Sequence, residues 1–174
     1  QGEAWGPEAR ELFAIRWELT RNRSRIDNVG MLEALAKAHL PVLSEFDPGL
    51  SAEMSAFADA TGMQEWELVI LNHYTDFRDI NPPLPHRAEP GGCSLVYMPT
   101  DNGPLSGQTW DMHTSALPYV ALLELTPPDG PPIVIFTVMG CMGMAGMNAH
   151  GVVVCINNLT PKNAGVGVLW PAVV

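Results

Sequence analysis

Residues 81–94 read NPPLPHRAEPGGCS, and this stretch divides the sequence into two unlike halves. Its four prolines cannot donate backbone hydrogen bonds, and the closing Gly91-Gly92 pair favours irregular backbone, so the stretch can neither continue a helix nor lie inside a sheet. The sequence therefore predicts an exposed linker that ends at Cys93.

The half before Cys93 carries most of the charge, with eight of the nine basic and 15 of the 19 acidic side chains. Apolar residues recur there at helical spacing in four segments. The segments are 7–25, 29–41, 50–62 and 64–77, and the second and third stop at Pro41 and Gly62. We therefore predict a solvated helical region over residues 1–92.

The half from Cys93 onward is nearly uncharged and rich in glycine and β-branched residues, as in sheets that are covered on both faces. Short apolar or alternating runs at 94–98, 105–111, 119–125, 133–139 and 152–157 are separated by turn-forming residues such as Asp101-Asn102-Gly103. These runs predict successive antiparallel hairpins over residues 93–174, and the whole chain is therefore expected to have an α+β fold.

Composition excludes several classes of function. A net charge of −10 over 174 residues argues against nucleic-acid binding. No apolar run is long enough for a membrane span, and no basic stretch followed by an apolar one marks a signal peptide, so we expect a cytoplasmic protein without membrane partners. The chain begins at Gln1 rather than Met, which leaves open whether a signal peptide precedes it. The oligomeric state cannot be predicted from these patterns.

The cysteines and histidines do not suggest a metal site. The five histidines lack ligand spacing and the three cysteines form no Cys-x-x-Cys pair, so we predict no metal and no cofactor. The methionine-rich tract 139–147 is expected to fill gaps between closely packed backbones rather than to bind a soft metal. Cys141 and Cys155 lie in apolar surroundings, where we predict inert thiols, that of Cys155 buried.

Cys93 differs because it follows a glycine pair and opens the first predicted strand. If the chain were cut before it, one residue would carry both a thiol and a free α-amine, whose reference pKa of about 7.7 to 8.0 suits it to take the thiol proton near neutral pH. Without a cut, Cys93 is a structural cysteine at a strand start. The pattern alone leaves both interpretations open.

The register of the first predicted hairpin decides which residue lies opposite Cys93, and one register makes Asp111 that residue. A three-residue loop Asp101-Asn102-Gly103 would pair Thr100 with Pro104 and therefore Cys93 with Asp111, on one face of the hairpin. A two-residue Asn-Gly turn would instead pair Cys93 with Met112 and send Asp111 to the other face. The first register predicts that the Asp111 carboxylate meets the α-amine of Cys93, and the simpler alternative is that it bonds a local turn.

Three segments carry a resemblance to a known family. They are Gly92-Cys93-Ser94, 107–111 (GQTWD) and 146–152 (GMNAHGV) leading to 155–157 (CIN), with 67–72 (ELVILN) upstream. In order and spacing they resemble the acyl-coenzyme A:6-aminopenicillanic acid acyltransferase family of N-terminal nucleophile hydrolases, and more distantly the bile-salt (choloylglycine) hydrolases and penicillin V acylases. Those distant relatives typically have Arg at the position of Gln108, which favours the acyltransferase branch.

The resemblance implies an αββα sandwich, begun by 93–174, and a helical propeptide, 1–92, removed by autoproteolysis between Gly92 and Cys93. It implies that Cys93 is the nucleophile, that Asp111 orients its α-amine and that the Asn157 backbone amide is an oxyanion donor. The expected activity is transfer of an acyl group from a small-molecule amide or acyl-CoA-like substrate through a thioester on Cys93. A conjugated-amide hydrolase of the bile-salt or penicillin V type and an uncleaved, non-catalytic binding domain remain alternatives. Since the 82 residues from Cys93 onward are too few for a four-layer sandwich, we expect a longer protein.

Overall fold

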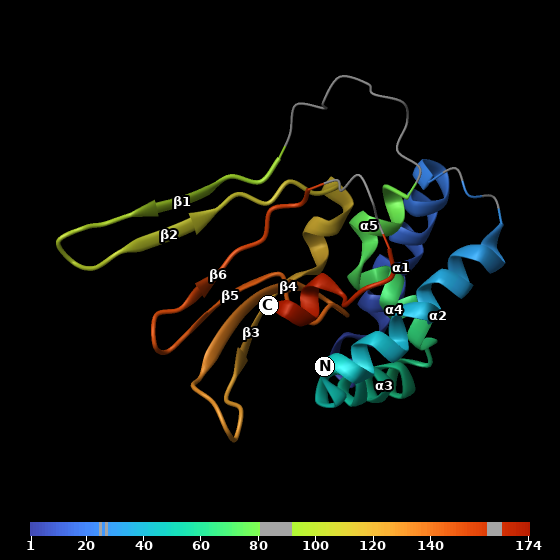
Figure 1. Ribbon diagram of the computed structural model, residues 1–174, viewed down its shortest axis with the longest axis horizontal. Coiled ribbons are helices and arrows are strands. Elements are labelled where there is room, and N and C mark those ends of the chain that lie inside the picture. Colours follow the sequence, from blue (N-terminus) through green and yellow to red (C-terminus); the bar gives the residue numbers. More distant parts are fainter. Residues whose placement is uncertain (25, 27, 81–91, 160–164) are drawn as a thin grey trace.

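The computed structural model describes residues 1–24, 26, 28–80, 92–159 and 165–174, and the linker predicted at 81–91 lies outside this range. The helices are α1 (Gly2–Ser24), α2 (Val29–Phe46), α3 (Pro48–Thr61), α4 (Glu65–Asn72), α5 (Tyr74–Arg78) and the 3₁₀ helices η1 (Thr114–Tyr119) and η2 (Trp170–Val173). The strands are β1 (Leu95–Met98), β2 (Leu105–Gln108), β3 (Val120–Leu125), β4 (Ile133–Val138), β5 (Ala145–Asn148) and β6 (Val153–Val154). Figure 1 shows the five α-helices gathered on one side of the sheets, so the fold is α+β.

The helices follow the predicted pattern with three corrections. The end at Gly62 is confirmed, because this residue has the left-handed φ of 69° that glycine adopts readily. The predicted start at Pro7 is wrong, since α1 begins at Gly2. The predicted end at Pro41 is also wrong: α2 continues to Phe46, and the carbonyl that loses its donor belongs to the exposed residue Lys37. The single helix expected over 64–77 is divided at His73 into α4 and α5.

The strands form two antiparallel sheets, β1-β2 and β3-β4-β5-β6, which confirms the predicted hairpins. The prediction missed β5, because its residues belong to the methionine- and glycine-rich tract that we interpreted only as filler. The β1–β2 hairpin extends away from the helices, and nearly all of its side chains are exposed (Figure 1).

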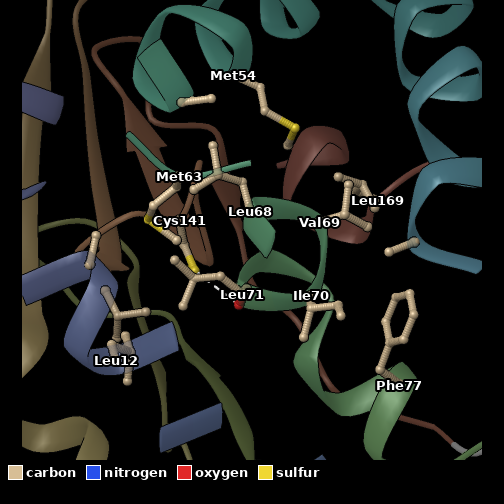
Figure 2. Packing of buried hydrophobic residues seen from close by; sticks show 14 of the residues in the cluster. Leu12, Met54, Met63, Leu68, Val69, Ile70, Leu71, Phe77, Cys141 and Leu169 are labelled. Atoms are coloured by element: carbon tan, nitrogen blue, oxygen red, sulfur yellow. Dashed lines mark hydrogen bonds between the residues drawn. The ribbon is translucent and has the colours of Figure 1, made fainter. Parts of the chain in front are cut away.

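A continuous core joins the helices to the turn after β4 (Figure 2). This turn requires Gly140, which has φ +87° and whose added Cβ would lie 2.6 Å from Leu71 Cδ2 and 2.9 Å from Ala9 Cβ. Next to it, Asn72 Nδ2 donates to Gly140 O (3.1 Å) and Asn72 Oδ1 accepts from Met142 N (2.8 Å). The helices and the sheet are therefore fixed to each other by close packing and by buried hydrogen bonds.

A buried arginine lies at the same contact between the helices and the turn after β4, which we call the joint. Arg16 of α1 is 1% exposed, and its Nη1 donates to Leu71 O at 2.5 Å and lies 3.4 Å from Cys141 Sγ. Figure 2 shows the Cys141 thiol directed at the same Leu71 carbonyl. The sequence predicted purely apolar surroundings for Cys141, and this prediction is wrong, because Arg16 and the Leu71 carbonyl both contact the thiol. Burial still raises the pKa of this thiol.

None of the described helices is long and apolar enough to cross a bilayer.

Candidate active site

A broad, open cleft with a volume of about 1410 Å³ lies between the β1–β2 hairpin, the β3–β6 sheet and helices α1 and α5. Its described lining brings together all four residues singled out from the sequence, Gly92, Cys93, Asp111 and Asn157. Cys93 is half-buried and unpaired, whereas Gly92, Asp111 and Asn157 are exposed. Cys93 and Asn157, which are 64 positions apart in the sequence, therefore reach the same cleft, from just before β1 and from the segment after β6.

The register of the first hairpin differs from the prediction by one residue. Leu95 pairs with Gln108 and Met98 with Leu105, so that Cys93 falls opposite Trp110 and Gly92 opposite Asp111. Gly103 N donates to Thr100 O (3.1 Å), which closes a turn with only Asp101 and Asn102 between them. The predicted direct pairing of Cys93 with Asp111 is wrong, because a two-residue loop has replaced the three-residue one.

Asp111 nevertheless contacts the backbone beside Cys93. The Gly92 N–H donates to Asp111 Oδ2 at 2.6 Å, and the Ser94 N–H donates to Thr109 Oγ1 at 2.9 Å. The Thr109 N–H in turn donates to Ser94 O at 2.9 Å. Side-chain oxygens thus accept the hydrogen bonds of the backbone on either side of Cys93, so the Gly92–Cys93 peptide is held against the 109–111 strand extension.

Gly92 has room for a larger residue. A Cβ added there would meet no atom within 4 Å, and its backbone is not in the left-handed region. Crowding in the folded chain therefore does not demand glycine at this position.

Gln108, at the end of β2, connects the hairpin to the segment that carries Asn157. Its Nε2 donates to Ile156 O, and its Oε1 accepts from Ile156 N at 3.1 Å. Sequence reasoning quoted Gln108 as part of a motif but assigned it no structural role. No local signal in the sequence marked this role, because its partner Ile156 lies 48 positions away.

The wall of the cleft formed by α5 carries the aromatic ring of Tyr74 together with one acidic and one basic side chain, Asp76 and Arg78. The guanidinium carbons of Arg16 and Arg78 lie 5.2 and 5.5 Å from the ring centre of Tyr74. Arg78 donates to Asp79 at 2.7 Å, which raises the pKa of Arg78. Burial, helped by the charges of Arg16 and Arg78, lowers the pKa of His113 to about 4, so its imidazole is neutral near pH 7.

Cys155 also lines the cleft and is half-buried, so the prediction that this thiol is buried is wrong. It directly follows β6, which is only two residues long and lies at the edge of its sheet, so no further strand covers β6 in the described part of the chain. Cys93 and Cys155 are therefore the two thiols of this cleft, while Cys141 is buried at the helix joint. No group of three or more His, Cys, Asp or Glu side chains suited to a metal ion occurs in the described ranges.

The chain is similar in sequence to an acyltransferase. The relative is the 40 kDa form of acyl-coenzyme A:6-aminopenicillanic-acid-acyltransferase from Emericella nidulans, with 31% identity over 135 residues. The match covers 74% of this chain and 34% of the relative, so the chain spans about a third of the relative's length. No protein-family profile matches the sequence.

Proposed function

We propose that this chain belongs to the acyl-coenzyme A:6-aminopenicillanic acid acyltransferase family and is an autoprocessing N-terminal-cysteine enzyme. In this proposal residues 1–92 are a propeptide and residues 93–174 begin an αββα N-terminal nucleophile hydrolase sandwich. The observation that carries the proposal is the convergence of Gly92, Cys93, Asp111 and Asn157 on one cleft, with Asp111 accepting the N–H of Gly92, the residue before the bond to be cut. The 31% identity to an acyltransferase supports the chemistry independently.

In the first reaction the chain cuts itself. The Cys93 thiol attacks the carbonyl carbon of Gly92, an S–C bond forms, the Gly92–Cys93 C–N bond breaks, and the thiol proton passes to the departing nitrogen. Water then hydrolyses the thioester, which leaves a carboxylic acid on Gly92 and a free thiol and α-amine on Cys93.

In the second reaction the new α-amine accepts the thiol proton while sulfur attacks the acyl carbon of the donor. The bond from that carbon to the donor's leaving group breaks, and the leaving group departs with the proton from the α-ammonium. The thioester on Cys93 then passes its acyl group to an amine or to water, which regenerates the free thiol. Asp111 has a specific part in this proposal. Before the cut its carboxylate accepts the Gly92 N–H, and departure of Gly92 releases that carboxylate for the new α-ammonium of Cys93. The backbone N–H of Asn157 donates to the oxyanion of each tetrahedral intermediate, a contribution of about 10² to 10³ in rate.

The proposed donor is a small-molecule acyl thioester of the acyl-coenzyme A class. Apolar side chains of the cleft, including Trp110, Met112, Phe136 and Met144, suit the acyl chain of such a donor. The name of the relative is consistent with this donor class.

The test is maturation of the purified full-length protein, followed by intact mass. We expect two fragments that together exceed the uncut chain by one water, the second beginning with Cys93. Cys93→Ala should stay uncut, while Cys155→Ala, which removes the other thiol of the same cleft, should be cut normally. The matured protein should release free thiol from octanoyl-coenzyme A, and Cys93 should be acylated in the process.

Other results would favour the alternatives. An uncut wild-type chain without thiol release favours a non-catalytic binding domain. If the protein is cut and hydrolyses conjugated amides but releases no thiol from octanoyl-coenzyme A, the result favours the hydrolase branch. Normal maturation of Cys93→Ala would contradict the proposal altogether.

A further inference from the structure

The side-chain amide of Gln108 makes the contact that a neighbouring β-strand would otherwise make. One carboxamide both donates to the Ile156 carbonyl and accepts from the Ile156 N–H, so both polar groups of a single backbone residue are satisfied. This two-way exchange has the pattern of a hydrogen-bonded pair in an antiparallel ladder. Gln108 therefore acts as a one-residue extension of the sheet.

No backbone hydrogen bond replaces this contact. The β1–β2 hairpin and the β3–β6 sheet are separate sheets, and the described residues of β2 and of 155–157 share no backbone hydrogen bond. The position of residues 155–157 relative to the hairpin that carries Cys93 and Asp111 therefore depends strongly on one side chain. Gln108 and Ile156 are both only half-buried, so water competes for these polar groups once the amide is removed.

Asn157 follows Ile156 directly. The peptide plane that joins them contains the Ile156 carbonyl, which accepts from Gln108 Nε2, and the Asn157 N–H. Because this plane is rigid, a hydrogen bond that fixes the direction of the carbonyl also fixes the opposite direction of the Asn157 N–H. Gln108 thus controls the orientation of a donor that it does not touch.

We propose that Gln108 is a positioning residue that holds the Ile156–Asn157 peptide and so fixes the direction of the Asn157 N–H in the cleft that Cys93 also lines. The inference rests on the proposed function, since it assumes that Asn157 is the oxyanion donor. In this inference the Gln108 side chain forms no bond to the substrate and acts only by orienting the backbone at Asn157.

The test compares two reactions of the same thiol in the matured full-length protein. Transfer from octanoyl-coenzyme A passes through an oxyanion, whereas alkylation of Cys93 by iodoacetamide does not. Gln108→Leu should lower kcat for thiol release by roughly 10- to 100-fold, with KM changed by less than about threefold, because the donor is displaced rather than removed. The alkylation rate of Cys93, read by peptide mapping to separate it from Cys155, should stay within about twofold of wild type.

Two further variants sharpen the comparison. Gln108→Glu keeps the acceptor for the Ile156 N–H but loses the donor to its carbonyl, so kcat should fall nearly as far as in Gln108→Leu. Asn102→Ala removes a carboxamide from the exposed tip of the same hairpin, and its kcat should be unchanged.

A measurement without turnover covers variants that fail to mature. In the uncut Cys93→Ala chain, amide hydrogen exchange at Ile156 should accelerate at least about tenfold when Gln108→Leu is added, and much less with Gln108→Glu. Unchanged exchange in Gln108→Leu would overturn the inference, as would unchanged kcat.

A parallel fall in kcat and in Cys93 alkylation would show a merely structural role and would also overturn it. Failure of the proposed function looks different, because wild-type protein would then be uncut or would release no thiol whatever residue 108 is.

Discussion

Asn72 is the residue whose replacement should most weaken the joint between the helices and the sheet. It is 2% exposed at the end of α4, and its Nδ2 donates to Leu68 O (2.9 Å) as well as to Gly140 O (3.1 Å). Its Oδ1 accepts the N–H of Met142 at 2.8 Å. One carboxamide therefore satisfies two backbone groups of the turn after β4, which lies 68 to 70 positions away in the sequence.

Asn72→Leu preserves the volume of the side chain and removes these hydrogen bonds. Leaving a buried donor or acceptor without a partner costs about 1 to 3 kcal/mol each, and the Gly140 carbonyl and the Met142 N–H both lose theirs. We expect the free energy of unfolding to fall by about 3 kcal/mol, because the Leu68 carbonyl keeps its helical partner.

The measurement is equilibrium unfolding in urea of the uncut Cys93→Ala chain, which avoids heterogeneity from cleavage. Asn102→Ala, an exposed carboxamide at the hairpin tip, is the control and should change the free energy by less than about 0.5 kcal/mol. A loss below about 1 kcal/mol in Asn72→Leu would refute the argument that these hydrogen bonds hold the joint.

Three further outcomes are expected. Asp111→Asn should mature but lose well over tenfold in acyl transfer, because a neutral amide holds the α-ammonium poorly; unchanged turnover in a thiol-release assay would contradict this. Burial lowers the pKa of His73 to about 4 although Asp76 opposes this, so the unfolded chain binds more protons below its pKa of about 6.5, and stability should drop as pH falls from 6.5 towards 4. In urea titrations at pH 7 and 5, His73→Leu should therefore lose less stability on acidification than wild type, and an equal loss would exclude His73 as the cause. Replacing Cys141 and Cys155 together by Ala should cost stability but leave thiol-dependent turnover, since Cys93 remains; complete loss of turnover in the folded, cleaved double variant would count against this.

Local patterns predicted most of the secondary structure. Helical spacing located the helices between residues 2 and 78, and alternating apolar runs located five of the six strands. These patterns succeed because each depends on residues a few positions apart, whose preferences act without knowledge of the rest of the chain. Gly62 shows this well, since a residue tolerant of positive φ ends a helix wherever the helix packs.

The secondary-structure and burial predictions failed at residues whose conformation depends on contacts with distant parts of the sequence. α4 ends where Asn72 turns its amide to residues 140 and 142. The burial of Arg16, a residue type that is rarely buried, depends on the Leu71 carbonyl, 55 residues away.

The site shows the same division between local and tertiary information. The residue types at 92, 93, 111 and 157 and their order are properties of the sequence, and they were sufficient to propose the chemistry. The hairpin register was decided by a turn one residue shorter than predicted and by Thr109 and Asp111, whose side chains replace backbone acceptors. The role of Gln108 depends on where β2 meets the segment after β6, because a carboxamide can pair with a backbone residue 48 positions away only when tertiary packing brings the two together.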